Sequence, residues 1–160
     1  MKVGITGHRR LHDPSLWGWV QAAFNNELDA LEAPVVAVSS LAIGADQLFA
    51  SMVAHRGGQI HAVIPFQGYE RTFSPQDVDA YRLILAKATS VEIMQTDGTD
   101  EDKYLAAGKR VVGLADLVIA MWDGKVAKGK GGTADIVAYA IQRGTRLIHV
   151  NPLDQSITKR

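Results

Sequence analysis

The sequence has no cysteine, no net charge and no long apolar run, and each absence narrows the kind of protein it encodes. Without cysteine there is no disulfide, thiol nucleophile or cysteine-ligated metal. No apolar stretch approaches the ~20 residues that a membrane-spanning helix needs. The opening residues enter a strand pattern at once, which leaves no room for a signal peptide. We therefore expect a cytoplasmic protein with no membrane contact.

Charge is balanced, because seventeen Lys and Arg residues are matched by seventeen Asp and Glu residues. General nucleic-acid binders carry an excess of positive charge that attracts phosphates, so nucleic acid is not an expected partner. The five histidines and the acidic segment 97–102 show no spacing typical of metal ligands. We expect neither a metal nor a required cofactor.

Short apolar runs alternate with segments of helical periodicity throughout the chain. The runs are rich in Val and Ile and show little polar alternation, as parallel strands buried on both faces do. Six strands are predicted, at Lys2–Thr6, Val35–Ser39, Ile60–Pro65, Ser90–Met94, Leu117–Trp122 and Arg146–Val150. Alternation of this kind builds βαβ units. The predicted fold is a single-domain Rossmann-like α/β protein over residues 1–150, an open parallel sheet of about six strands with helices on both faces, followed by a C-terminal tail at 151–160.

Each predicted helix has a recognisable start. Asp13 is a candidate N-cap with Pro14 at the first helical position, and the segment Ser74–Asp77 has the S-x-x-D form of a capping box. The remaining helices are predicted to begin near Gly44–Asp46, Thr99–Asp100 and Thr133, and the last one to end at Gly144.

The stretch 115–139 carries the clearest functional signal. An apolar strand leads through a glycine-rich loop into an amphipathic helix, with Thr133 at the expected N-cap. Backbone amides at such a helix start are unpaired, and the helix dipole adds positive potential. The loop glycines are Gly129, Gly131 and Gly132, and the nearby lysines are Lys125, Lys128 and Lys130. We predict an anion cradle for a phosphate. The segment 124–131 nearly fits G-x-x-x-x-G-K-[ST], but it lacks the final hydroxyl, so an NTPase is rejected.

Ligands of open parallel sheets bind beyond the carboxyl ends of the strands, so the residues that follow the strands form the candidate site. Arg9 follows the first strand, and its fork suits a phosphate or a carboxylate; a capped turn with a solvated arginine is the alternative. Asp46 either binds a ribose hydroxyl or only caps the second helix. Phe66 either stacks on a base or only packs its loop. The predicted ligand-binding residues are Thr6, Gly7, His8, Arg9, Ser39, Gly44, Ala45, Asp46, Phe66, Trp122, Asp123, Gly124, Gly131, Gly132 and Thr133.

Four segments occur in a specific order: GITGHR at 4–9, GADQ at 44–47, ADLVIAMWDG at 115–124 and GGTADIVAYA at 131–140. Together they resemble the Rossmann-like SLOG superfamily, which joins the Lonely Guy proteins, DNA-processing protein A and the molybdenum-cofactor carrier proteins. Pro65-Phe66 and the helix around Tyr81 look like its small bacterial YpsA-like branch. The resemblance implies a nucleotide or nucleotide-derived ligand, with its phosphate at 131–133 and its base and ribose near 7–9 and 44–46. Many relatives form dimers, which implies a homodimer or higher homo-oligomer.

One departure from the family pattern bears on the chemistry. Lonely Guy phosphoribohydrolases carry P-G-G-x-G-T-x-x-E, whose glutamate takes part in glycosidic cleavage. Here that position is Ile136, and Asp135 lies one residue earlier, about 100° around the helix. The first hypothesis is therefore a binding module for a small-molecule nucleotide or nucleoside phosphate, a sensor or carrier.

The alternative is an N-glycosidic enzyme, either a nucleoside 5'-monophosphate phosphoribohydrolase or a nucleoside deoxyribosyltransferase. Such chemistry needs a carboxylate near the anomeric carbon, and the candidates are Asp46, Asp123 and Asp135. A single-stranded DNA binder, by analogy with the DNA-processing relatives, is least favoured because no basic stripe is evident.

Overall fold

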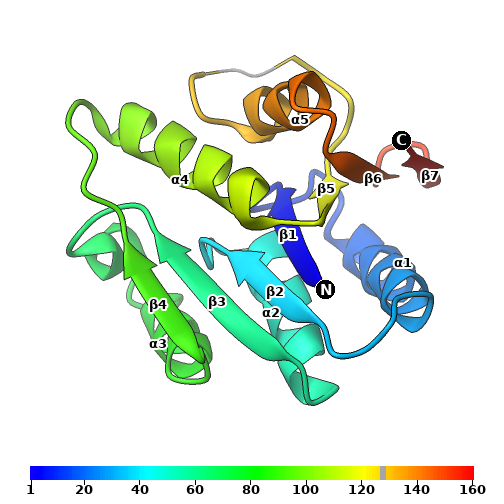
Figure 1. Cartoon of the computed structure of the whole chain (residues 1–160), viewed down its shortest axis with the longest axis horizontal. Helices are drawn as coiled ribbons and strands as arrows, with labels where there is room; N and C mark the ends of the chain where they lie inside the picture. Colours follow the sequence, from blue (N-terminus) through cyan, green and yellow to red (C-terminus); the bar gives the residue numbers. More distant parts are fainter. Residues whose placement is uncertain (127–128) are drawn as a thin grey trace.

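The computed structural model describes residues 1–126 and 129–160, and it contains one seven-stranded sheet with helices on both faces (Figure 1). The strands are β1 Lys2–Gly7, β2 Val36–Ser39, β3 Gln59–Ile64, β4 Ser90–Ile93, β5 Leu117–Met121, β6 Arg146–Asn151 and β7 Ser156–Lys159. The α-helices are α1 Trp17–Asp29, α2 Ala45–His55, α3 Val78–Leu85, α4 Asp100–Leu114 and α5 Thr133–Gln142, with short 3-10 helices η1 Pro14–Leu16 and η2 Tyr69–Thr72.

The strand order is β4-β3-β2-β1-β5-β6-β7, and every neighbouring pair except β6–β7 is parallel. The chain moves outward from β1 to β4, then returns across the sheet to place β5 on the other side of β1. This reversal is the topological switch point. The connections that leave β1 and β5 run to opposite faces of the sheet, and a crevice remains between them. All six predicted strands are present, and the predicted Rossmann-like α/β fold is confirmed.

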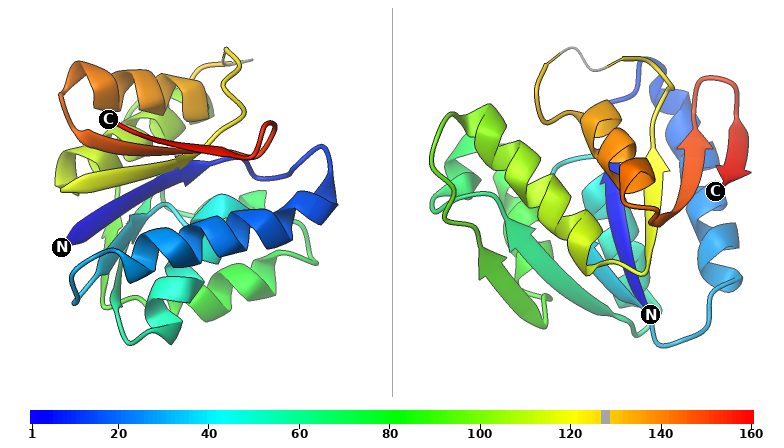
Figure 2. Two further views of the ribbon diagram at one scale, coloured as in Figure 1. Left: turned by 90° about the vertical axis from the view of Figure 1, so that its right-hand side faces the viewer. Right: turned by 45° about the horizontal axis from the view of Figure 1, so that its top comes forward.

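Helices α1, α2 and α3 cover one face of the sheet, and α4 and α5 cover the other, as the left view of Figure 2 shows. The larger core lies between the sheet and the first group of helices. There Phe24 of α1 meets Phe49 of α2 edge to face, with ring centroids 5.5 Å apart, and both side chains are fully buried. No described helix is both long and apolar enough to cross a bilayer.

The C-terminal segment 151–160 differs from the expected tail. It turns back after β6 and forms β7, which pairs antiparallel with β6 from Ile148 to Asn151. Lys159 also forms an ion pair of 2.7 Å with Glu27, a buried residue of α1. The four residues of β7 are polar or exposed and carry little strand signal themselves. The strand forms because β6 would otherwise leave an unpaired edge.

Of two predicted helix starts, one is confirmed and the other is wrong. Asp13 caps η1 as predicted, since its carboxylate accepts hydrogen bonds from the Ser15 amide at 3.0 Å and the Ser15 hydroxyl at 2.7 Å. The capping box at Ser74–Asp77 was wrong. The Ser74 hydroxyl bonds to the Asp77 carboxylate at 2.7 Å, and α3 begins only at Val78.

A capping box does form at the start of α4, in the acidic segment that was predicted to cap a helix. The Thr99 hydroxyl accepts from the Asp102 amide at 3.2 Å, and the Asp102 carboxylate accepts from the Thr99 amide at 3.0 Å. At the other end of the fold, α5 ends at Gln142 with Arg143 as its C-cap, and the predicted stop Gly144 follows with a positive φ of 68°.

Candidate functional site

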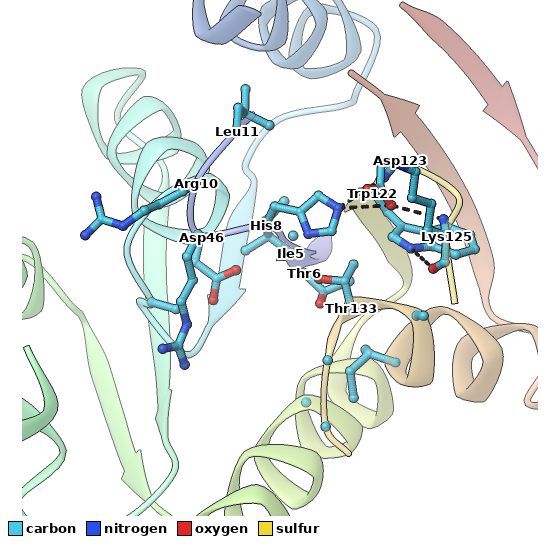
Figure 3. A pocket seen from close by; sticks show the side chains of 18 of the residues that line it. Ile5, Thr6, His8, Arg10, Leu11, Asp46, Trp122, Asp123, Lys125 and Thr133 are labelled. Atoms are coloured by element: carbon cyan, nitrogen blue, oxygen red, sulfur yellow. Dashed lines mark hydrogen bonds and ion pairs between the residues drawn. The ribbon is translucent and has the colours of Figure 1, made fainter. Parts of the chain in front are cut away.

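A cleft of about 1030 Å³ opens at the switch point, beyond the carboxyl ends of β1 and β5. It is bounded by the loop after β1, the first turn of α2, the outer face of α4, the start of α5 and the turn between β6 and β7. Figure 3 shows labelled lining residues, with the His8 ring between Asp46 on one side and Asp123 on the other. The cleft therefore lies where the sequence predicted a ligand site.

The end of β1 supplies Thr6 and Gly7 to the cleft, and the turn after β1 supplies His8 and Arg9. Gly44, immediately before α2, adopts φ 89°, and a Cβ there would lie 2.4 Å from the Arg9 carbonyl oxygen. The next amide, of Ala45, donates a hydrogen bond of 3.2 Å to the His8 carbonyl. Gly44 and Ala45 consequently hold the turn from behind and do not line the cleft, contrary to the ligand-binding role predicted for them.

Asp46, in the first turn of α2, presents a carboxylate to the cleft although only 6% of the residue is exposed. The hydroxyl of fully buried Ser39 donates to Asp46 Oδ2 at 3.2 Å. Burial raises the pKa of Asp46 to about 7, and the bond from Ser39 and the charge of Arg9 offset only part of this effect. The Asp46 carboxyl group can therefore gain or lose a proton near neutral pH. Ser39, one of the predicted ligand-binding residues, supports it from beneath and does not line the cleft.

His8 and Asp123 meet across the ends of β1 and β5. The Asp123 amide lies 3.2 Å from His8 Nε2, within hydrogen-bonding distance. Asp123 Oδ1 lies 3.4 Å from the same nitrogen and accepts from the Lys125 amide at 3.0 Å. Burial raises the pKa of Asp123, but the Lys125 amide and His8 outweigh it and leave the pKa below its usual value. Asp123 is therefore ionised at neutral pH.

Trp122 lines the cleft beside Asp123, and its indole Nε1 donates to the Lys125 carbonyl at 2.8 Å. This bond closes the first turn of the loop. Gly124 lies within that turn, with φ 80°, and does not reach the cleft. Its role is to reverse the chain, so the predicted ligand contact of Gly124 is not made.

The structure of the glycine loop before α5 differs from two predictions. The helix begins at Thr133 itself, with Gly132 as the N-cap and no side chain capping it. The Asp135 carboxylate accepts from the Gly131 amide at 2.8 Å. Asp135 is turned away from the cleft and fastens the loop, so it is poorly placed as the catalytic carboxylate. Lys128 lies outside the described residues.

The amides of Gly132, Thr133 and Ala134 find no acceptor among the described residues, and all three residues line the cleft. They are the unpaired N–H groups of a helix start, reinforced by the dipole of α5. The loop is held against α4: a Cβ on Gly131, with φ 84°, would lie 2.9 Å from the Glu101 carbonyl oxygen. Gly131 therefore braces the loop and the next three amides are open to the cleft, while anion binding at this helix start stays a prediction.

Tyr104 of α4 lines the cleft and was missed from the sequence. The Arg9 guanidinium lies 5.4 Å from the centre of its ring. Phe66, which was predicted to contact the ligand, instead packs behind Tyr104, with ring centroids 5.8 Å apart, and does not line the cleft. Tyr104, Gly108 and Val111 form one face of α4 at a spacing of three to four residues. That spacing was visible in the sequence, but it is also the spacing of ordinary core residues.

Two further parts of the lining carried no usable signal. Ile136 of α5, at the position of the Lonely Guy glutamate, packs over Gly108 and lines the cleft. Pro152, Leu153 and Gln155 of the β6–β7 turn complete the wall beside Trp122. The structure thus places an apolar side chain, that of Ile136, in the wall of the cleft beside Gly108.

Fold and cleft together define a Rossmann-like α/β protein with its candidate site at the switch point. No protein-family model and no curated protein sequence matches the chain. Several solved structures are similar to it. DNA processing protein A from Streptococcus pneumoniae superposes with a TM-score of 0.65 at 20% identity, covering 92% of this chain and 49% of that one. The same protein from Helicobacter pylori, whose structure concerns single-stranded DNA binding, gives 0.64 at 18% identity, covering 93% and 64%.

A structural-genomics target named TM1055 has a TM-score of 0.58 at 14% identity, covering 91% of this chain and 71% of that one. Identities this low establish the fold, and the predicted Rossmann-like fold, which this chain shares with DNA processing protein A, is confirmed. The likeness to the YpsA-like branch stays a prediction. This chain spans about half of the first neighbour and under two thirds of the second. The single-stranded DNA binding of the Helicobacter pylori protein leaves the prediction against nucleic acid without support.

Proposed function

We propose that this protein binds a nucleotide, with the phosphate at the start of α5. The observation that carries the proposal is the set of open amides of Gly132, Thr133 and Ala134 facing the switch-point cleft. A helix start combines converging donors with positive potential, and this combination recurs where nucleotide phosphates bind. The cleft volume of about 1030 Å³ leaves room for the sugar and base as well.

The charges around the cleft support an anionic ligand. Arg9, Arg10, Lys125 and Lys130 all line it. Arg10 lies 3.5 Å from Asp77, and Lys130 pairs with Asp102 at the start of α4. Arg9 contacts the Tyr104 ring instead of a carboxylate. Its fork is therefore available to a phosphate or to the edge of a base.

Substituting Thr133 tests the phosphate site directly. Thr133→Pro removes one open amide at the first helical position, where proline is well tolerated. The preceding Gly132 has φ −73° and ψ 173°, the extended conformation that a residue before proline prefers. Thr133→Ala is the matched control, because it removes the hydroxyl and keeps the amide. We expect titration calorimetry to show AMP binding weakened about 10-fold by Thr133→Pro and little changed by Thr133→Ala.

Adenosine, which has no phosphate, should bind the wild type and Thr133→Pro equally. Equal AMP affinity in wild type and Thr133→Pro, with the fold intact, would contradict the phosphate assignment. Failure of AMP, GMP and ADP-ribose to bind at all would overturn the proposed function. An oligothymidylate belongs in the same screen: affinity that rises with its length and falls steeply with salt would indicate single-stranded DNA as the ligand.

A second candidate function, N-glycosidic cleavage, is favoured by one observation. Two carboxyl groups with separated pKa values line the same cleft, Asp46 with its pKa raised to about 7 and Asp123 with its pKa lowered. Such a pair divides naturally into a proton donor and an ionised partner. Asp46 would protonate the departing base while Asp123 stabilised the positive charge on the sugar.

Chromatographic detection of adenine released from AMP or deoxyadenosine tests this activity. An enzyme should lose the activity in Asp46→Asn and in Asp123→Asn, while Asp135→Asn, whose side chain faces the loop, should retain most of it. No release by the wild type, or equal trace rates in all the variants, would eliminate the enzyme and leave the binding function standing.

A further inference from the structure

Asp46 is a charged group in an unusual position for a helix start. It belongs to the first turn of α2 but makes no capping bond to that helix, whose N-cap is Gly44. Its carboxylate is buried from bulk water and reaches the cleft, where it accepts a hydrogen bond of 3.2 Å from the Ser39 hydroxyl beneath it and is also stabilised by the Ala42 and Ser40 amides. A carboxylate has about four acceptor sites, so it retains capacity for a ligand that enters the cleft.

The groups around Asp46 form a subsite for a planar ring. Arg9 approaches from the turn after β1, Tyr69 from η2, and Tyr104 from α4. Burial raises the pKa of Tyr69, which therefore stays neutral, and Arg9 is the charged group that faces Asp46. The Arg9 guanidinium and the Tyr104 ring both offer flat surfaces on which a base stacks. The His8 ring is directed to Asp123 and leaves this side of the cleft open.

We propose that Asp46 recognises the Watson–Crick edge of the bound base, selecting guanine over adenine when it is ionised and losing that selection when it is protonated. The inference rests on the proposed nucleotide binding. Guanine presents two adjacent donors, N1–H and N2–H, which match the two acceptor oxygens of a carboxylate. Adenine presents the acceptor N1 beside the donor N6–H. A protonated carboxyl group complements that pair, because its O–H donates to N1 and its carbonyl oxygen accepts from N6–H, and it complements O6 and N1–H of guanine in the same way.

The selection therefore depends on pH within the physiological range. Burial raises the pKa of Asp46 to about 7, so the carboxyl group is mostly protonated at pH 5.5 and mostly ionised at pH 8.5. Guanine binding favours the ionised form and adenine binding favours the protonated form. By linkage, affinity for a guanine nucleotide should rise relative to an adenine nucleotide as the pH rises through 7.

The test compares the dissociation constants of GMP and AMP by calorimetry at pH 5.5 and pH 8.5. Both ligands carry the same 5'-phosphate, so titration of the phosphate cancels in their ratio. We expect the ratio of AMP to GMP dissociation constants to increase about 10-fold or more between the two pH values. In Asp46→Asn the amide carries a fixed donor and acceptor, which match N1 and N6–H of adenine and O6 and N1–H of guanine alike. This variant should lose the preference for GMP at pH 8.5, with a ratio independent of pH.

Asp13→Asn is the control, because Asp13 also lines the cleft but is exposed and occupied with the Ser15 bonds that cap η1. It should keep the pH-dependent ratio of the wild type. Binding of both nucleotides with a ratio that neither pH nor Asp46→Asn alters would overturn the inference and leave nucleotide binding intact. Loss of the pH dependence in Asp13→Asn would also overturn it. Failure of either nucleotide to bind the wild type would remove the proposed function as well.

Discussion

Replacing Gly44 by alanine should destabilise the protein and weaken its site together, because this glycine joins α2 to the turn after β1. Its backbone has φ 89° and ψ −127°, a region that alanine adopts only under strain. An added Cβ would also lie 2.4 Å from the Arg9 carbonyl oxygen and 2.5 Å from that of His8. Both obstacles are backbone atoms, so relief requires the turn itself to move.

Gly57 is the control that separates backbone strain from steric overlap. It follows α2, has a similar φ of 79°, and an added Cβ would meet nothing within 4 Å. Both alanine variants incur backbone strain of about 1–3 kcal/mol, and both constrain the unfolded chain to the same extent. Gly44→Ala alone adds steric overlap, which costs about 1–3 kcal/mol in packed regions. We therefore expect Gly44→Ala to be less stable than Gly57→Ala by about 1–3 kcal/mol.

Urea denaturation of the two variants measures this difference, and thermal unfolding should show it as a gap of roughly 2–10 °C. Nucleotide affinity gives a second readout, because only Gly44→Ala displaces His8 and Arg9. Equal stability and equal affinity in the two variants would refute the proposition that Gly44 positions the turn.

Three further substitutions test other contacts. Asp46→Asn should make stability less dependent on pH: the raised pKa of Asp46 favours the fold fully below pH 3.8, and this stability is lost as the pH rises through about 7. The free energy of unfolding from urea denaturation should therefore fall over that range by up to about 4 kcal/mol more in the wild type than in the variant. Gly108→Ala should be destabilising because its Cβ would lie 2.4 Å from Ile136 Cδ1, and the double variant with Ile136→Val should recover stability non-additively. Asp102→Asn should lower the melting temperature at pH 7, because Lys130 and Thr99 hold the pKa of Asp102 at about 2. The stability from this carboxylate is present above pH 3.8 and is lost as the pH falls through 2. Thermal scans at decreasing pH should therefore show the melting temperatures of the two proteins converging.

Local chemistry made much of the fold predictable. The six parallel strands were visible as Val- and Ile-rich runs, because both faces of a central strand are buried and no polar alternation is tolerated. Asp13 followed by Pro14 marked a helix start, and Gly144 marked a helix end, because capping depends on residues adjacent in sequence. β7 was missed for the opposite reason. Its residues have little strand preference of their own, and the open edge of β6 decides their conformation.

The candidate site was also predictable only in part. Which loops meet at the cleft followed from the order of strands, since the carboxyl ends of parallel strands share one edge of the sheet. Which side chains enter the cleft did not. Asp135 and Ile136 are neighbours in sequence, yet one bonds to the Gly131 amide and the other lines the cleft. A rotation of about 100° per residue separates them, and only the packing of α5 against α4 sets its direction.

By itself, the sequence determined a Rossmann-like sheet, a glycine loop opening into a helix, and a polar turn after β1. Each depends on interactions within a few residues or on a periodic pattern. The tertiary structure alone decided that Gly44 and Ala45 lie behind the site, that Tyr104 of α4 enters it, and that Asp46 is buried beside Ser39. The protonation of Asp46 near neutral pH is of this second kind, because desolvation is produced by elements far apart in the chain.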